Sequence, residues 1–223
     1  MGKLYLVPTP IGNLKDITYR AVEVLKSADL ILAEDTRKTG ILLKHFSISC
    51  PLRSHHKFNE HKAIDKIAAE IKEGKTIALV TDAGTPGISD PGFLLARKCI
   101  SEGIEVETLP GPVAFIPALV NSGLPCDKFC FEGFLPVKKG RSGRISELSL
   151  EKRTIVLYES PHRLLKTLKQ FAEVTGPERR GSVAREISKI HEENIRGSLG
   201  ELIDHFAENN PRGEIVLIIE GSK

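Results

Sequence analysis

The chain has 223 residues, of which 40% are hydrophobic and 27% are charged. This is the composition of a globular protein with enough apolar residues for one large or two compact α/β units. The 32 basic and 29 acidic side chains nearly balance, which excludes a global electrostatic argument for nucleic-acid binding, so any such contact must rest on a local cluster.

The cysteines and the N-terminal segment both bear on the cellular compartment. The four cysteines have neither zinc-ligand spacing nor the density of a disulfide scaffold, which favours reduced thiols. The first apolar run is broken by Pro8 and Pro10 and is too short for a signal peptide. No stretch reaches the roughly 18 apolar residues of a membrane helix. We therefore expect a cytoplasmic protein without a membrane partner.

Short β-rich runs alternate with amphipathic stretches along the whole chain, and this alternation is typical of an α/β protein. The expected strands are residues 3–7, 29–34, 76–81, 105–109, 128–134, 153–159, 181–186 and 213–221.

Two helices between these runs have clear signals. Residues 61–74 place Ile64, Ile67, Ala68 and Ile71 on one face, and Gly74 follows as a helix end. Residues 89–103 predict a helix with Asp90 as N-cap and Pro91 as its first residue.

Residues 110–126 are rich in proline and mark the expected boundary between two α/β lobes. We place the N-terminal lobe at residues 1–112 and the C-terminal lobe at residues 113–223.

The most unusual segment is LVTDAGTPGISDPG, residues 79–92, which follows a predicted strand and contains three glycines and two prolines within nine positions. Such an irregular turn favours a ligand-binding loop over an ordinary surface turn. Its spacing matches neither a dinucleotide-binding nor a nucleoside-triphosphate loop.

The exit of the first strand, VPTPIGNL at residues 7–14, is also irregular, because Pro8 and Pro10 prevent a central strand from continuing. Ligands of open α/β sheets lie at the carboxyl ends of strands. The two exits therefore predict one pocket if their strands are neighbours, and two unrelated turns if they are not.

These residues carry a family resemblance. The segments VPTPIGNLKDIT, ILAEDTR, VTDAGTPGISDPG, PGPVAFIPAL, YESPHR, VAREISKIHEE and RGEIVLIIEG occur in this order from the first strand to the last. Together they resemble the bacterial 16S rRNA (cytidine-2'-O)-methyltransferases of the tetrapyrrole methylase superfamily.

The resemblance implies a two-lobed tetrapyrrole methylase fold, that is, a class III S-adenosylmethionine-dependent methyltransferase fold, with the cofactor in the cleft between the lobes. It also implies a homodimer that acts on 16S rRNA in the small ribosomal subunit. Members of this family usually continue into a small C-terminal module, whereas this sequence stops at Lys223. On that basis the usual C-terminal extension is expected to be absent.

The family pattern also implies the cofactor contacts. The turn of residues 83–86 corresponds to the Gly-Gly-Asp-Pro turn of tetrapyrrole methylases, with Thr85 in place of aspartate. The implied S-adenosylmethionine-binding residues are Thr9, Pro10, Gly12, Ala83, Gly84, Thr85, Pro86, Ile88, Val113, Ala114, Tyr158 and Ile187.

A ribose 2'-hydroxyl is a poor nucleophile, so alignment with the electrophilic methyl group is expected to supply much of the acceleration. We predict that Glu159 or Glu186 orients or deprotonates the hydroxyl and that Arg185, in the same catalytic set, holds phosphate. Ion pairs without a catalytic role are the alternative interpretation of these charges. No metal is expected, because His55, His56 and His61 match no standard metal motif.

RNA contacts are expected from basic and polar residues that follow strands, and from the segment PVKKGRSGRIS, residues 136–146, which has four cations and no acidic residue. A solubilising loop is the alternative for that segment. The predicted substrate-binding residues are Asp35, Arg37, His162, Arg163, Lys138, Lys139, Arg141 and Arg144. A second basic and partly aromatic surface is expected around Lys57 and Phe58.

Two other functions remain open at this stage. A methyltransferase of the same fold could act on a tetrapyrrole or a protein acceptor, and would not need the basic segment. A non-catalytic RNA-binding assembly factor would not need the two irregular strand exits.

Overall fold

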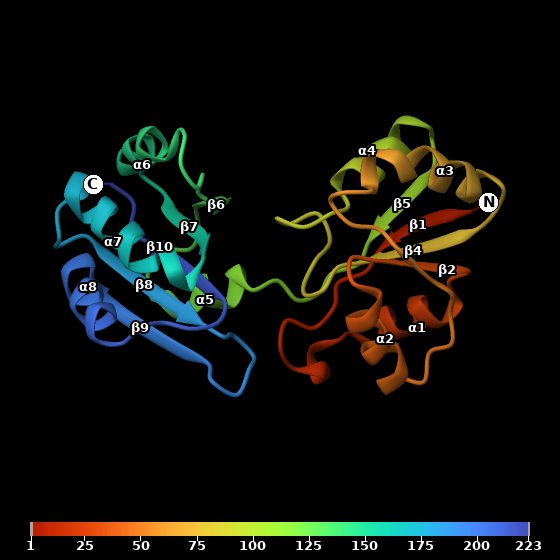
Figure 1. The fold of residues 1–223 in the computed structure, drawn as a ribbon, viewed down its shortest axis with the longest axis horizontal. Coiled ribbons are helices and arrows are strands. Elements are labelled where there is room, and N and C mark those ends of the chain that lie inside the picture. Colours follow the sequence, from red (N-terminus) through yellow and green to blue (C-terminus); the bar gives the residue numbers. More distant parts are fainter. Residues whose placement is uncertain (1, 223) are drawn as a thin grey trace. The chain divides into compact units, whose positions relative to one another are not determined.

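The computed structural model describes residues 2–222, which divide into two compact units between Val113 and Ala114 (Figure 1). This division lies one residue from the boundary expected at 112/113. Both units are α/β, as predicted, and each predicted strand segment contains a strand. Each unit is described by itself.

The N-terminal unit contains a parallel five-stranded sheet in the order β3-β2-β4-β1-β5. Its strands are β1 (Lys3–Leu6), β2 (Leu30–Ala33), β3 (Leu52–Ser54), β4 (Thr76–Val80) and β5 (Glu105–Thr108). Its helices are the 3-10 helix η1 (Leu14–Asp16), α1 (Tyr19–Ser27), α2 (Thr36–His45), α3 (Glu60–Lys72) and α4 (Phe93–Ser101).

The helices cover both faces of this sheet (Figure 1). One core packs α3 and α4 against Leu4, Ile77 and Leu79. The other packs α1 and α2 against Ile31 and Ala78. Alternate residues of the central strands thus enter opposite cores, which explains why these strands appear in the sequence as continuous apolar runs.

The order of the strands determines where a ligand can bind. The chain leaves β1 toward the face that α1 covers, and it leaves β4 toward the face that α4 covers. Because β1 and β4 are neighbours, their carboxyl ends form a switch point, where ligands of open parallel sheets bind.

The predicted start of α4 is wrong. The helix begins at Phe93, not at Pro91, and Gly92 is its N-cap with φ of 135°. A Cβ atom at Gly92 would lie 3.0 Å from Leu79 Cδ2. The turn packs so closely on β4 that a glycine is needed there, and the helix starts only after it.

The C-terminal unit contains a mixed five-stranded sheet in the order β6-β7-β10-β8-β9, in which only β6 and β7 are parallel. Its strands are β6 (Phe129–Phe134), β7 (Thr154–Glu159), β8 (Arg180–Arg185), β9 (Glu193–Ser198) and β10 (Ile215–Ile219). Its helices are α5 (Phe115–Ser122), α6 (Arg141–Ser149), α7 (Pro161–Thr175) and α8 (Leu199–Glu208).

The core of this unit packs α6, α7 and α8 against alternate residues of the strands, among them Leu157, Val183 and Leu217. Helix α5 contacts β7, β8, β9 and β10 and contributes no residue to that core. It therefore covers the other face of the sheet. No helix within residues 2–222 has the length and apolar composition needed to cross a membrane.

Candidate functional site

The exits of β1 and β4 are joined by backbone hydrogen bonds. Thr9 and Gly84 form an isolated antiparallel bridge, with N–H to O distances of 2.9 and 3.0 Å in the two directions. The buried Thr9 hydroxyl donates to the Thr81 carbonyl at 3.1 Å. The two irregular segments singled out in the sequence therefore form one structure.

The loop after β5 joins the same structure. Leu109 N–H donates to the Leu6 carbonyl at 3.0 Å, and the Thr85 hydroxyl donates to the Pro112 carbonyl at 2.9 Å. Three strand exits thus meet at one edge of the sheet. We call them the donor loops, comprising residues 7–12, 81–92 and 109–113.

The donor loops contain backbone N–H groups that are available as hydrogen-bond donors. Gly84 has φ of 83°, a conformation that side chains rarely adopt. Within the N-terminal unit, no acceptor is recorded for the N–H groups of Ala83 and Thr85 on either side of it. Unpaired backbone N–H groups need a partner, and a carboxylate or another polar ligand group fits this requirement.

The donor loops contain most of the predicted cofactor residues. Thr9, Gly84 and Pro86 are buried, and the others are half-buried or exposed. The members in this unit are Thr9, Pro10, Gly12, Ala83, Gly84, Thr85, Pro86, Ile88 and Val113. Ala114, Tyr158 and Ile187 belong to the C-terminal unit. The contact of all twelve residues with the cofactor stays a prediction.

The exit of β2 adds charged groups beside the donor loops. Asp82 accepts from the Asp35 N–H at 3.1 Å and pairs with Lys38 at 2.6 Å. Burial and the nearby Asp82 carboxylate raise the pKa of Glu34. Sequence analysis did not select Asp82 or Lys38, although Asp82 lies within the irregular segment.

Asp35 and Arg37 were predicted to bind substrate. The Asp35 side chain accepts from Arg37 N–H at 2.9 Å and pairs with the Arg37 guanidinium at 2.7 Å. Hydrogen bonds from Arg37 hold the pKa of Asp35 well below its usual range. The Arg37 side chain is nevertheless 88% exposed, so its remaining N–H groups are open to a phosphate.

Two of the three residues predicted to be catalytic do not have the environment of a general base. The Glu159 carboxylate is buried and pairs with Arg163 at 2.9 Å and Arg141 at 3.2 Å. It also accepts from Thr167 at 2.6 Å and from the Ser160 N–H at 2.7 Å. Both oxygens of Glu159 are bound within the unit, as in a structural ion pair, and this environment does not favour the catalytic role, which stays a prediction.

Glu186 is held in a tight turn with φ of 53°. Its Oε1 accepts from Lys189 and from the Glu214 N–H, both at 2.8 Å. The Lys189 and Glu214 bonds lower the pKa of this carboxyl. A lowered pKa makes a carboxylate a weaker base, so the environment does not favour proton abstraction by Glu186.

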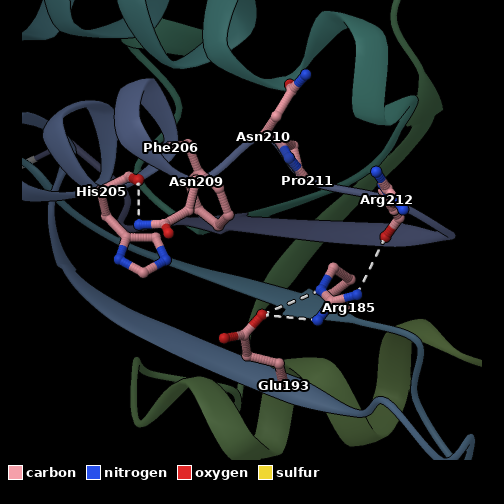
Figure 2. A pocket seen from close by; sticks show the side chains of 8 residues that line it. All are labelled: Arg185, Glu193, His205, Phe206, Asn209, Asn210, Pro211 and Arg212. Carbon is pink, nitrogen blue, oxygen red and sulfur yellow. Dashed lines mark hydrogen bonds and ion pairs between the residues drawn. The ribbon is translucent and has the colours of Figure 1, made fainter.

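Arg185, the third predicted catalytic residue, lies in a pocket of about 320 Å³ between the end of β8 and the loop after α8. Figure 2 shows its guanidinium between Glu193, at 3.0 Å, and the carbonyl of Arg212, at 3.4 Å. This arrangement fixes the guanidinium within the C-terminal unit.

The four cations of residues 136–146 separate into two kinds. Arg141 is buried beneath Glu159, and Arg144 pairs with Glu132 at 2.5 Å and with Glu147 at 2.7 Å. The Arg141 guanidinium is bound inside the unit, which does not favour an RNA contact, and the contact stays a prediction. Lys138 and Lys139 are exposed and have no ion pair recorded within the unit.

The remaining predicted contacts differ in exposure. His162 is exposed at the start of α7, and Arg163 is half-buried in its ion pair with Glu159. Phe58 is exposed beside His56. Among residues 2–222 no group of three or more His, Cys, Asp and Glu side chains is arranged to hold a metal ion.

His55 follows β3 and is fully buried, with no hydrogen-bond partner for either ring nitrogen among the described residues. Burial lowers the pKa of His55 to about 4, with a smaller effect from His56. The unfolded chain therefore binds a proton at His55 below about pH 6.5 that the folded chain does not bind.

Stability should consequently fall as the pH drops from about 6.5 to about 4, by up to roughly 3 kcal/mol from this residue. In His55→Phe the decline over this range should be smaller, as measured by urea unfolding at several pH values. Replacing the exposed His162 by Gln is the matched control and should leave the decline unchanged. A wild-type pH profile in His55→Phe would contradict the assignment.

Comparison with known proteins agrees with this architecture. Residues 3–203 match the family model of tetrapyrrole (corrin/porphyrin) methylases. A cobalt precorrin-4 methyltransferase has a TM-score of 0.71 at 19% identity, covering 98% of this chain and 94% of that one. The methyltransferase CobJ has a TM-score of 0.72 at 17% identity, covering 100% and 95%. The chain belongs to the tetrapyrrole methylase family.

The relatives found by sequence comparison give a more specific assignment within this family. The ribosomal RNA small subunit methyltransferase I of Escherichia coli O157:H7 is 51% identical over 100% of this chain and 79% of the relative. The protein of the same name from Thermotoga maritima is 49% identical over 100% of both chains. Within the family, this chain therefore groups with the ribosomal RNA small subunit methyltransferases I.

Proposed function

We propose that the protein transfers a methyl group from S-adenosylmethionine to the ribose 2'-hydroxyl of a cytidine in 16S rRNA. The joining of three strand exits into the donor loops is the structural observation that carries this proposal. The two full-length relatives named above support the ribosomal substrate. The resemblance of the sequence motifs supports the cytidine and the 2'-hydroxyl.

The donor loops fit the cofactor. The N–H groups of Ala83 and Thr85 would donate to polar groups of its methionine part, and Gly84 leaves room for that approach. The Thr85 hydroxyl already donates to Pro112, so it holds the turn in place. When bound, S-adenosylmethionine supplies an electrophilic methyl group on sulfur.

The chain's own contribution is mainly positioning. The pKa of Glu186 is lowered by its bonds to Lys189 and Glu214, and both oxygens of Glu159 are already bound within the unit, so neither environment suits a general base. Correct alignment of a hydroxyl with a reactive centre can by itself contribute several kcal/mol, on the order of 7 or more. Arg37, next to the donor loops, and the exposed lysines of the C-terminal unit are the groups we assign to phosphate contacts.

The proposed substrate also indicates the cellular compartment. Bacterial small ribosomal subunits are assembled in the cytoplasm, so we place the protein there. The homodimer implied by the family resemblance and a cofactor contact from Tyr158 and Ile187 belong to the same proposal.

One experiment separates this function from its alternatives. Purified protein with methyl-labelled S-adenosylmethionine should label 16S rRNA in small subunits from cells that lack this modification, and nuclease digestion should yield 2'-O-methylcytidine. Label in a tetrapyrrole or a protein instead would assign another acceptor. Cofactor binding measured by calorimetry is the control, since a non-catalytic RNA-binding protein would show none.

A further inference from the structure

A second pocket of the C-terminal unit lies outside all the residues so far assigned to the cofactor. It has a volume of about 510 Å³ and lies between the end of β6, the loop that follows it and the start of α6. It is lined by Glu132, Phe134, Leu135, Pro136, Gly140, Gly143, Arg144 and Glu147.

The aromatic ring in this pocket is accessible. Phe134 is the last residue of β6 and is 55% exposed, whereas the next residue, Leu135, is buried and anchors the chain. A register shift in the β6–β7 pairing between Phe131 and Gly133 precedes it. Such bulges change the direction of the following side chains and are frequent beside functional sites.

The Phe134 ring also packs against an aromatic neighbour. Its centroid lies 5.6 Å from that of Tyr158, which in turn packs edge-on against Phe131 at 5.2 Å. A ring held on one side by other aromatic groups and open on the other offers a fixed platform, because little side-chain entropy remains to be lost when a ligand stacks on it.

The wall of the pocket presents both donors and acceptors. The Arg144 guanidinium lies between Glu132 and Glu147, at 2.5 and 2.7 Å. The carboxylate of Glu147 is 68% exposed. The edge of a nucleobase, which combines amino or imino donors with carbonyl or ring-nitrogen acceptors, matches such a wall.

Two cations lie on the loop that borders the pocket. Lys138 and Lys139 follow the lining residue Pro136 and precede Gly140. Both are exposed, and no ion pair is recorded for either within the unit. Arg141 and Arg144, in contrast, are neutralised by carboxylates. The charge available to phosphates on this loop is therefore that of two residues.

We propose that this pocket binds an unpaired nucleotide of the RNA substrate, with its base stacked on Phe134 and its flanking phosphates on Lys138 and Lys139. Stacking of splayed-out bases on aromatic side chains, with cations along the backbone, is the usual way in which proteins hold single-stranded RNA. This inference rests on the proposed function and adds a substrate contact to it.

A fluorescent residue can report the stacking directly. The chain contains no tryptophan, so Phe134→Trp would place a single indole in the pocket. Addition of a single-stranded oligoribonucleotide should quench its fluorescence saturably, and a duplex of equal length should quench it much less. Val174→Trp, at an exposed position near the end of α7, is the control and should show no saturable quenching.

Turnover gives an independent measurement. With small subunits as substrate, Phe134→Ala should raise KM by about 10-fold or more, because stacking of one base is typically worth that much. Phe134→Tyr should retain the wild-type KM, and S-adenosylmethionine affinity should be the same in both variants. Val137→Ala removes another exposed apolar side chain on this loop and should have little effect.

The salt dependence of RNA affinity tests the contribution of Lys138 and Lys139. Lys138→Ala with Lys139→Ala should flatten the plot of log affinity for single-stranded RNA against log salt by about 1.4, since each phosphate contact contributes about 0.7. Lys166→Ala with Lys169→Ala removes two exposed lysines of α7 and should leave the slope unchanged.

Several results would overturn the pocket assignment. Unquenched Phe134→Trp together with a wild-type KM for Phe134→Ala would do so, even if the wild-type protein methylates small subunits. Loss of self-association in Phe134→Ala, seen by sedimentation, would assign the surface to a second copy of the chain. If wild-type protein methylates no RNA but Phe134→Trp is quenched, the pocket binds RNA and only the proposed reaction fails.

Discussion

Gly84→Val should abolish S-adenosylmethionine binding while the N-terminal unit remains folded. Gly84 has φ of 83°, and a Cβ at this position would lie 3.4 Å from Ile11 Cγ2 and 3.6 Å from the Pro112 carbonyl oxygen. A Cβ atom therefore has room among its neighbours, but the β-branch of valine is expected to occupy the approach to the N–H groups of Ala83 and Thr85. The strained backbone would cost about 1–3 kcal/mol.

The control for that strain is Gly103→Val. Gly103 also has positive φ, 69°, but it lies after α4 with open space around its Cβ position. Both variants should lose similar stability in urea unfolding, whereas only Gly84→Val should lose the calorimetric signal of cofactor binding. Wild-type cofactor affinity in a folded Gly84→Val protein would show that the donor loops do not hold the cofactor.

The donor loops were predictable because their signals are local. Pro8 and Pro10 end β1, and the glycines and prolines of residues 79–92 exclude a regular helix or strand. What the sequence could not provide was the adjacency of β1 and β4, which are separated by some 70 residues. Parallel pairing is a long-range contact, and only the structure shows the Thr9–Gly84 bridge that results from it.

Sequence analysis did not predict strands β3 and β9, for a related reason. β3 has three residues, none of them buried, and β9 is polar and half-buried. Both lie at an edge of their sheet. Edge strands bury little apolar surface, so they lack the continuous apolar pattern by which the central strands were recognised.

The charged residues show a different limit of prediction from sequence. Lys138, Lys139, Arg141 and Arg144 look equivalent in a segment without acidic residues, yet Glu132, Glu147 and Glu159 approach two of them from other elements. Charge is visible in a sequence, whereas burial and pairing depend on the fold. The same fact explains why Glu159 looked catalytic and why the accessible ring of Phe134 was taken for an ordinary strand residue.

Arg141→Met should destabilise the C-terminal unit by about 3 kcal/mol. The guanidinium contacts Glu159 at 3.2 Å, Thr167 at 2.5 Å and Gln170 at 2.9 Å, and it is buried with them. Removing it leaves the Glu159 carboxylate buried with only Arg163 as a charged partner. Urea unfolding would measure the loss, and faster hydrogen exchange in β7, α6 and α7 would localise it.

A second substitution distinguishes an uncompensated charge from lost packing. Arg141→Met combined with Glu159→Gln should be more stable than Arg141→Met alone, because the nearly fully buried Glu159 charge is then removed and the cation that loses its partner, Arg163, is 23% exposed, whereas two independent packing losses would add. Lys139→Ala, which removes an exposed cation from the same loop, should leave stability unchanged. If Arg141→Met unfolds like the wild type but lowers affinity for small subunits, then Arg141 contacts RNA, and its ion pair with Glu159 does not stabilise the unit.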